Sequence, residues 1–378
     1  MRRAGFKAWD TEMNAYVIIG VLIALGGVVF AANKASHLLT LAIFLASCGG
    51  MVGVFITERR KLSSKPAGKV DYTRLNTTNL LPYKDWLKEN VRGHDAVIDS
   101  IITSMQEELS LARTGRILGA YLVVGPTGTG KTLLSTLIAQ ALFPKSEPII
   151  LRMNQLKHPD DVFTLIGAPP GRAGYEVGGA LTRPVLENPY RVVIFDELEK
   201  CHHDIHDCLY DILDAGQCRE KSSGKVVDFS GCAFFATSNA GVDELREIFE
   251  RTEDFNQRLT QSRDVLVSVS GFDKAFLARW TRIEFMDAID SIHIAEVALL
   301  QLCQYWKEYG VEVSYVPPEM LVEAVERNEE FKSYGVRQLS GYIRSKTNQA
   351  INQARQGNVK KVMLDVSAEG EIVIRNHA

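Results

Sequence analysis

The sequence predicts an α/β fold built on a parallel sheet and followed by a small, mainly α-helical subdomain. Apolar strand-like runs alternate with helical patterns between residues 119 and 239, which is typical of a parallel sheet covered by helices on both faces. A glycine-rich motif, "GPTGTGKT", lies between the first of these strands and the helix that follows it. After residue 287 the pattern becomes mostly helical.

Two apolar runs precede this core and predict a two-helix transmembrane hairpin at residues 1–60. They cover residues 15–32 and 38–56, which are 18 and 19 residues long, with only "NKASH" between them. A bilayer core about 30 Å thick requires roughly 20 helical residues. Basic residues flank the pair on both sides, so we expect both chain ends to lie in the cytoplasm. A cleaved signal peptide is the alternative, but a second apolar run follows at once.

Gly49 and Gly53 form a GxxxG pattern in the second run, which indicates either close helix packing or a chance match. Residues 61–79 are polar and rich in Ser, Pro, Gly and basic side chains, and predict a juxtamembrane linker. A large subdomain is then expected at 80–287 and a small one at 288–378.

The elements of the large subdomain follow in order. Residues 95–115 have helical spacing and end in Gly115, a plausible C-cap. A helix is also predicted at 132–143, and strands at 119–125, 148–153, 190–197 and 232–239. In the small subdomain the predictions are helices at 291–310, 318–328 and 335–357 and a last strand at 371–376.

Composition narrows the class of protein. The formal net charge is -3, so no global basic field favours a nucleic-acid partner. The six cysteines are scattered without a CxxC pair, which fits a reducing compartment better than a disulfide framework.

The glycine-rich motif, Gly125 to Thr132, fits the phosphate-binding pattern G-x-x-x-x-G-K-[ST] in full. Lys131 should reach the β- and γ-phosphates, and the Thr132 hydroxyl should bind Mg²⁺. The backbone of the loop should surround the phosphates, with the residues Pro126, Thr127, Gly128, Thr129 and Gly130. ATP and Mg²⁺ are therefore the expected cofactors.

Polar side chains end the two following buried strands. Asp196 should hold Mg²⁺ beside Thr132, and Glu197 should orient and activate the attacking water. Asn239 ends the next strand, where its amide would bridge the water and the γ-phosphate or form a simple Asn turn.

Together these segments resemble the AAA+ superfamily, and closely the second ATPase module of the Clp unfoldases and disaggregases. The likeness covers roughly Leu80 to the C-terminus and includes "VRGHDAV", "IFDELEK", "LYDILDAGQ", "FFATSN", "FLARWTRIEF" and "YGVRQL". The resemblance implies an ATP-driven homo-oligomeric ring, usually of six subunits, with each site between neighbours.

The resemblance also implies roles for single residues. Asn239 matches the sensor-1 residue and Arg337 the sensor-2 arginine, while Val91 and Gly93 would lie by the adenine. Arg279 matches the arginine finger that reaches a neighbour's γ-phosphate, and Arg282 is the competing candidate.

The stretch "GAPPGRAGYEVGG" at residues 167–179 is similar to the family's pore loop, whose first tyrosine grips a threaded polypeptide. That position is Arg172 here, followed by Ala173, and Tyr175 matches the second tyrosine. Arginine favours carboxylates, phosphates and aromatic faces instead. Between Asn239 and Arg279 there is also no clear tripeptide for docking a peptidase.

His202 and His206 stand four residues apart in "CHHDIHDC", a spacing that can share a metal on one helix face. The alternative is a helix carrying ordinary Cys and His side chains.

We expect a membrane-anchored ATPase that remodels, extracts or unfolds proteins at the cytoplasmic face of a bacterial inner membrane, with membrane lipid and a protein substrate or membrane-protein partner. The alternative is a nucleotide-switched assembly or scaffold component that does not thread polypeptide. A nucleic-acid motor is a third hypothesis, which the net charge does not favour.

Overall fold

The computed structural model describes residues 70–172, 175–330, 337–367 and 370–376. The predicted transmembrane hairpin, residues 61–69 of the predicted linker and Ala173 lie outside the described residues. Among the helices of the described part, none combines the length and apolar character needed to cross a bilayer. All the described residues belong to one compact unit, which begins at Ala67.

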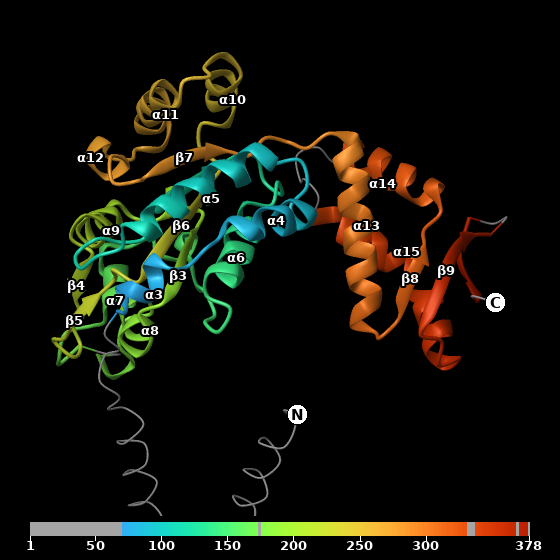
Figure 1. Cartoon of the computed structure of the whole chain (residues 1–378), viewed down its shortest axis with the longest axis horizontal. Coiled ribbons are helices and arrows are strands. Elements are labelled where there is room, and N and C mark those ends of the chain that lie inside the picture. The colour runs from blue at the N-terminus through green and yellow to red at the C-terminus, as the bar shows by residue number, and fades with distance from the viewer. Residues whose placement is uncertain (1–69, 173–174, 331–336, 368–369, 377–378) are drawn as a thin grey trace, which may run out of the picture. The chain divides into compact units, whose positions relative to one another are not determined.

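A five-stranded parallel sheet forms the centre of the large subdomain (Figure 1). Its strand order is β2-β3-β6-β1-β7, and β1 pairs in parallel with both β6 and β7. The bounds are β1 Ala120–Val124, β2 Ile149–Arg152, β3 Arg191–Asp196, β6 Cys232–Ser238 and β7 Arg282–Phe285. The four predicted strands are therefore confirmed, whereas β7 at the sheet edge was not predicted.

Side chains of the central strands β1, β3 and β6 alternate between two apolar clusters, one on each face of the sheet. Tyr121 and Val123 of β1 belong to one cluster and Leu122 and Val124 to the other. The first face is covered by α3 Tyr72–Asn76, α4 Lys84–Asn90, α5 Asp95–Ser110 and α6 Lys131–Leu142. The second is covered by α7 Val162–Ile166, α8 Thr182–Glu187, α9 His203–Ala215, α10 Val242–Arg251, α11 Phe255–Ser270 and α12 Lys274–Leu277. A short hairpin, β4 Gln217–Arg219 with β5 Val226–Asp228, follows α9.

Two local predictions differ from the structure. The end of the predicted linker folds as α3, because Leu75 buries its side chain in the core of the first sheet face. The predicted helix at 95–115 ends at Ser110, so Gly115 is not its C-cap. Gly115 instead has a φ of 74° in the turn that leads to β1, beside the backbone of Gly216.

The small subdomain has its own core around Trp306 and contains a sheet as well as helices. Its helices are α13 Ser291–Glu308, α14 Pro318–Glu330 and α15 Arg337–Gln356. Its strands are β8 Glu312–Tyr315, β9 Lys361–Val366 and β10 Ile372–Asn376, in the order β10-β9-β8. The predicted last strand is confirmed as β10, while β8 and β9 were not predicted.

Candidate active site

The carboxyl ends of β1, β3 and β6 meet at one edge of the large sheet and open onto a cavity of about 280 Å³. Parallel strands place their carboxyl ends on the same side, which is where ligands bind in open α/β sheets. The lining includes the loop after β1, the carboxylates after β3 and the amide after β6, with Lys131, Thr132, Asp196, Glu197, Thr237 and Asn239.

Three glycines of the loop after β1 are required for different reasons. Gly128 and Gly130 have φ values of 85° and 96°, a left-handed region that favours glycine. Gly125 is required by contact, because a Cβ there would lie 2.0 Å from the carbonyl oxygen of Met286. The loop leads directly into α6, whose amino end favours anions. Backbone and helix therefore fit a polyphosphate.

Lys131 begins α6 and reaches back over this loop. Its Nζ donates to the carbonyl oxygens of Gly125 and Pro126 at 2.6 and 2.7 Å and to Oδ1 of Asn239 at 2.9 Å. The lysine is buried, so its ammonium is largely shielded from water. The structure thus brings together Lys131 and Asn239, which are 108 residues apart.

Asp196 lies at the centre of a hydroxyl network. Its Oδ1 accepts hydrogen bonds of 2.8 Å from both Thr132 Oγ1 and Thr237 Oγ1. Hydroxyl and carboxylate oxygens are ligands that Mg²⁺ accepts, so Thr132 and Asp196 fit this ion. The Thr237 hydroxyl also accepts from the backbone N–H of Glu197 at 3.0 Å and so ties both acidic residues to β6. Thr237 was not predicted as a site residue, although it precedes Asn239 by two residues.

Glu197 has both carboxylate oxygens engaged. Asn154 Nδ2 donates to Oε2 at 2.7 Å, and Lys200 Nζ lies 2.9 Å from Oε1. The backbone of Glu197 has a φ of 59°, which is uncommon outside glycine and is associated with functional sites. Asn154 lies in a 3₁₀ turn at Met153–Gln155, directly after β2, and no motif in the sequence indicated it.

Of the two residues predicted to lie by the adenine, Val91 is close to the phosphate loop and Gly93 is close to the beginning of the small subdomain. Val91 is buried, and its Cγ1 would lie 3.8 Å from a Cβ placed on Gly130. Gly93 has a φ of 79°, and a Cβ there would approach Ile289 Cγ2 to 2.8 Å. The next residue, His94, is buried, and burial lowers the pKa of its imidazole to about 4, so the ring is neutral.

The structure separates the two candidate finger arginines. Arg282 lies on β7 with its guanidinium 4.2 Å from the ring centroid of Phe255 and donates to Ser100 Oγ at 3.0 Å. Its side chain is 19% exposed, against 31% for Arg279. Arg279, which follows α12, is therefore the more exposed of the two arginines. Arg337 begins α15, and its side chain is outside the described part.

Arg172 of the predicted pore loop is held by its own chain. Its guanidinium forms an ion pair with Asp160 and lies 4.5 Å from the ring centroid of Phe163. Tyr175 begins a 3₁₀ turn, Tyr175–Val177, and Tyr175 and Val177 are both exposed.

His202 and His206 do not face a common metal position. His206 is buried, stacks on Phe276 and places Nε2 3.3 Å from Cys201 Sγ. His202 caps α9, where its side chain accepts from the backbone N–H of Asp204. The interpretation as an ordinary helix therefore holds.

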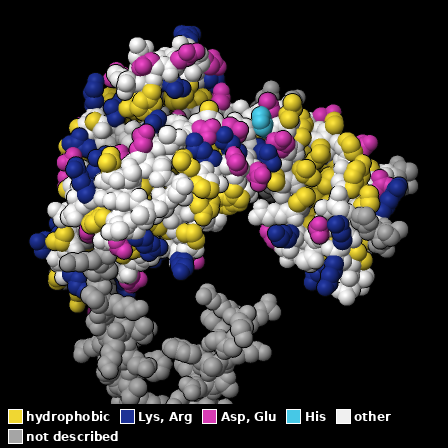
Figure 2. Space-filling view, viewed as in Figure 1, with side chains coloured by type: hydrophobic (Ala, Val, Ile, Leu, Met, Phe, Trp, Pro, Cys, Tyr) yellow, Lys and Arg dark blue, Asp and Glu magenta, His cyan; other side chains and the backbone are white. Residues whose placement is uncertain are grey.

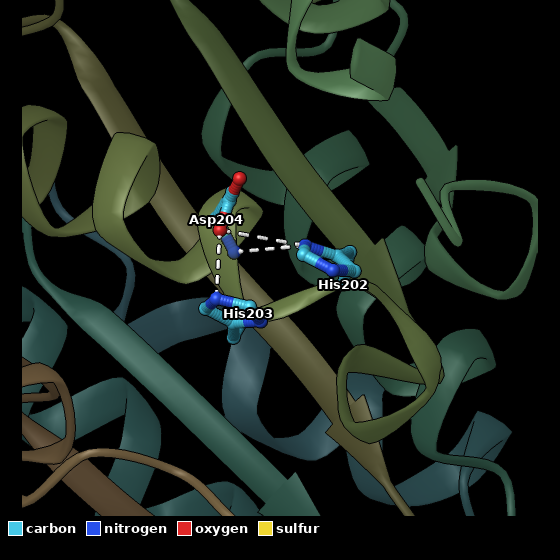
Figure 3. A group of neighbouring side chains, drawn as sticks. All are labelled: His202, His203 and Asp204. Atoms are coloured by element: carbon cyan, nitrogen blue, oxygen red, sulfur yellow. Dashed lines mark hydrogen bonds and ion pairs between the residues drawn. The ribbon is translucent and has the colours of Figure 1, made fainter. Parts of the chain in front are cut away.

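Figure 3 shows His202, His203 and Asp204 turned toward one another at the beginning of α9. His203 Nε2 lies 2.8 Å from Asp204 Oδ1, so these groups satisfy one another. Burial raises the pKa of the nearby Cys201 and Cys208 thiols to about 12, so neither is a thiolate at neutral pH.

Comparisons with known proteins agree with this geometry. The family model "AAA domain (Cdc48 subfamily)" matches residues 116–283. "Negative regulator of genetic competence ClpC/MecB" of Bacillus subtilis (strain 168) is 30% identical over 329 residues, which is 83% of this chain and 40% of that protein. "Chaperone protein ClpB" of Clostridium tetani is 30% identical over 340 residues, 87% of this chain and 39% of that protein.

A shorter match covers about half of the chain. "Chaperone protein ClpB" of Lactiplantibacillus plantarum is 37% identical over 193 residues, 49% of this chain and 22% of that protein. The chain thus spans well under half the length of these curated relatives. The family match and these relatives identify the chain as one that carries a Clp-like AAA domain, an ATP-hydrolysing module.

Proposed function

We propose that this chain hydrolyses ATP with Mg²⁺ to remodel, extract or unfold protein substrates at the cytoplasmic face of a membrane. The observation that carries the chemical part is the network that joins Thr132, Asp196, Thr237 and Glu197 at one sheet edge, beside Lys131. It places an ammonium, two hydroxyls and two carboxylates around one cavity at the amino end of a helix.

Each side chain has one task in this proposal. Lys131 holds the β- and γ-phosphates, and Thr132 with Asp196 would hold Mg²⁺, which neutralises phosphate charge when bound. Glu197 orients the attacking water and accepts its proton. Because Oδ1 of Asn239 faces Lys131, its amide nitrogen is left to contact the γ-phosphate or the water.

Ring assembly supplies the rest of the site. Arg279 belongs on a neighbour's γ-phosphate, and its partly exposed position after α12 is compatible with that role. Figure 2 shows hydrophobic side chains gathered over α13 and α14, where Ile292, Leu299 and Val322 are exposed. Apolar surface of this kind marks an interaction site, and a homo-oligomeric, hexameric ring would cover it.

Different observations support the protein substrate and the membrane anchor in this proposal. Two of the compared relatives carry the name chaperone, which supports protein remodelling. The apolar runs at residues 15–32 and 38–56 support a two-pass anchor with both ends in the cytoplasm, as in a bacterial inner membrane. Membrane lipid and a membrane-protein partner follow from the same anchor.

One observation favours the alternative of a nucleotide-switched scaffold that does not thread polypeptide. Arg172 replaces a gripping tyrosine and is paired with Asp160 and Phe163 of its own chain. A charge-paired arginine offers a passing chain less apolar contact than a tyrosine does.

An unfolding assay separates the two functions. The full chain in detergent, with ATP and Mg²⁺, is given several tagged fluorescent proteins, and fluorescence and phosphate release are recorded together. Remodelling predicts ATP-dependent loss of fluorescence with at least one substrate. Phosphate release without any loss of fluorescence would leave the scaffold function, and no phosphate release would overturn both.

A further inference from the structure

We infer that Tyr210 and Asp214 of α9 are positioning residues that hold the guanidinium of Arg279 in the geometry it needs to act on a neighbouring subunit. The inference rests on the proposed role of Arg279 and extends it to two side chains that no motif indicated. Neither residue lines the nucleotide cavity of its own subunit.

The contacts define a clamp made by two side chains of α9. The guanidinium carbon of Arg279 lies 4.6 Å from the ring centroid of Tyr210, and Nη2 donates to the Tyr210 hydroxyl at 2.6 Å. Along the same edge of the guanidinium, Nε of Arg279 forms an ion pair with Asp214 Oδ1 at 2.5 Å. Tyr210 and Asp214 are four residues apart on one helix, so they present their side chains on the same face.

The clamp leaves part of the guanidinium available. Arginine has five N–H donors in a fixed planar fork. Asp214 faces the Nε edge and Tyr210 takes one N–H of Nη2, so Nη1 remains able to donate to a phosphate oxygen. An arginine held in this way loses less rotamer freedom when it meets a phosphate than an unrestrained one does.

The charges around Arg279 also allow its guanidinium to contact a γ-phosphate of the neighbouring subunit. The side chain of Asp214 is half exposed, so water screens its attraction for Arg279. A γ-phosphate carries more charge and can draw the outer edge of the guanidinium without breaking the clamp. Arg282 differs because it lies deeper, close to the buried carboxylate of Glu284 on its own strand.

Conservative substitutions separate positioning from folding. Tyr210→Phe keeps the aromatic ring and removes the hydroxyl, and Asp214→Asn keeps the shape and removes the charge. Since each change removes one charge-assisted contact to Arg279, we expect kcat for ATP to fall about tenfold while KM changes less than about twofold. Tyr309→Phe and Asp264→Asn, both on exposed surfaces away from the cavity, are matched controls and should leave kcat unchanged.

Mixed rings provide the decisive measurement. Glu197→Gln subunits keep their arginine but lack the water-orienting carboxylate, whereas Arg279→Ala subunits keep the site and lack the arginine. Mixing full-length subunits of the two kinds should restore ATP turnover, because the first kind donates the arginine to the second. Tyr210→Phe with Asp214→Asn should abolish this recovery when placed on the Glu197→Gln subunit and not when placed on the Arg279→Ala subunit.

The outcomes separate failure of the inference from failure of the proposed function. Normal turnover by Arg279→Ala alone, or no recovery in mixed rings of the two parent variants, would overturn the proposed role of Arg279 itself. Recovery that the clamp substitutions leave unchanged would overturn the clamp alone. Equal loss from either placement would mean that α9 is merely damaged, which also overturns it.

Discussion

Asn154 donates a hydrogen bond of 2.7 Å from its side-chain amide to Oε2 of Glu197, across the neighbouring strands β2 and β3. Lys200 holds the other carboxylate oxygen. A carboxylate that orients water must offer an oxygen to it, and in this arrangement both oxygens already have protein partners. The contact therefore restrains the residue that we propose as the base in hydrolysis.

Removing the carboxylate should stop the reaction without stopping binding. We expect Glu197→Gln to reduce ATP turnover by about 10²-fold or more, since general-base catalysis contributes typically 10²–10⁴ in rate. Nucleotide affinity, measured with a fluorescent ATP analogue, should stay within about threefold because Lys131 and the loop are intact. Equal turnover by the wild-type and variant proteins would show that Glu197 is not the base.

Removing the Asn154 side chain that restrains Glu197 should increase ATP turnover. Asn154→Ala frees Oε2 of Glu197, so we expect basal ATP turnover to rise about three- to tenfold, which corresponds to roughly 0.6–1.4 kcal/mol, within the net range of a typical hydrogen bond. Steady-state phosphate release with KM determined in parallel measures this. Asn348→Ala, on α15, removes a surface amide that bonds Tyr305 and serves as the control. A fall in turnover would instead assign Asn154 to positioning of Glu197.

The first glycine of the phosphate loop should tolerate no side chain. Gly125→Ala would bring a Cβ to 2.0 Å from a backbone oxygen that cannot rotate away, so we expect a loss of at least about 2 kcal/mol in the free energy of unfolding. Gly341→Ala on α15 meets nothing within 4 Å and should gain about 0.5–1 kcal/mol through helix propensity. Chemical denaturation of both variants gives the comparison, and equal stabilities would contradict the contact.

Burial of His94 should make stability depend on pH. The unfolded chain protonates this imidazole near its ordinary pKa of 6.5, whereas the folded chain protonates it only near 4. The unfolded state therefore binds more protons between these values, and the free energy of unfolding falls as pH is lowered from about 6.5 to 4. The loss is at most about 3 kcal/mol. Denaturation of wild type and His94→Gln at pH 7.5 and 5 should show a smaller loss in the variant, and parallel losses would exclude His94 as the cause.

Arg172 determines how the predicted pore loop can contact a polypeptide. We expect Arg172→Tyr to increase the unfolding rate of an unrelated tagged fluorescent protein about three- to tenfold, because an aromatic ring adds apolar contact that a charge-paired guanidinium does not. Basal ATP turnover should stay the same, since Arg172 is not among the residues that line the nucleotide cavity. Unchanged unfolding by both Arg172→Tyr and Arg172→Ala would argue against any gripping role.

Sequence patterns predicted the central strands because their apolar runs are buried on both sheet faces. The edge strand β7 was not predicted, because Arg282 and Glu284 interrupt its apolar residues. Both of these side chains bond to Ser100, which is distant in the chain. The strands β8 and β9 are short and lie beside longer helical patterns. Their pairing is long-range, so local spacing did not reveal it.

Motifs predicted most of the candidate site because the residues of each motif are close together in the sequence. Lys131, Thr132, Asp196 and Glu197 stand in short stretches whose spacing reflects the chemistry directly. Asn154 and Thr237 act through contacts between strands, and only the strand order places them beside Glu197 and Asp196. Their roles therefore depend on tertiary structure.

The close approach of Gly125 to Met286 has a mechanical consequence. The backbone of Met286 donates to the carbonyl oxygen of Val124 at 2.8 Å, and four residues later the chain enters the cap of α13. With no side chain between the two backbones, a displacement of the phosphate loop cannot be absorbed locally. We therefore expect a displacement of the proposed phosphate loop to move the segment that leads to the helices of the small subdomain.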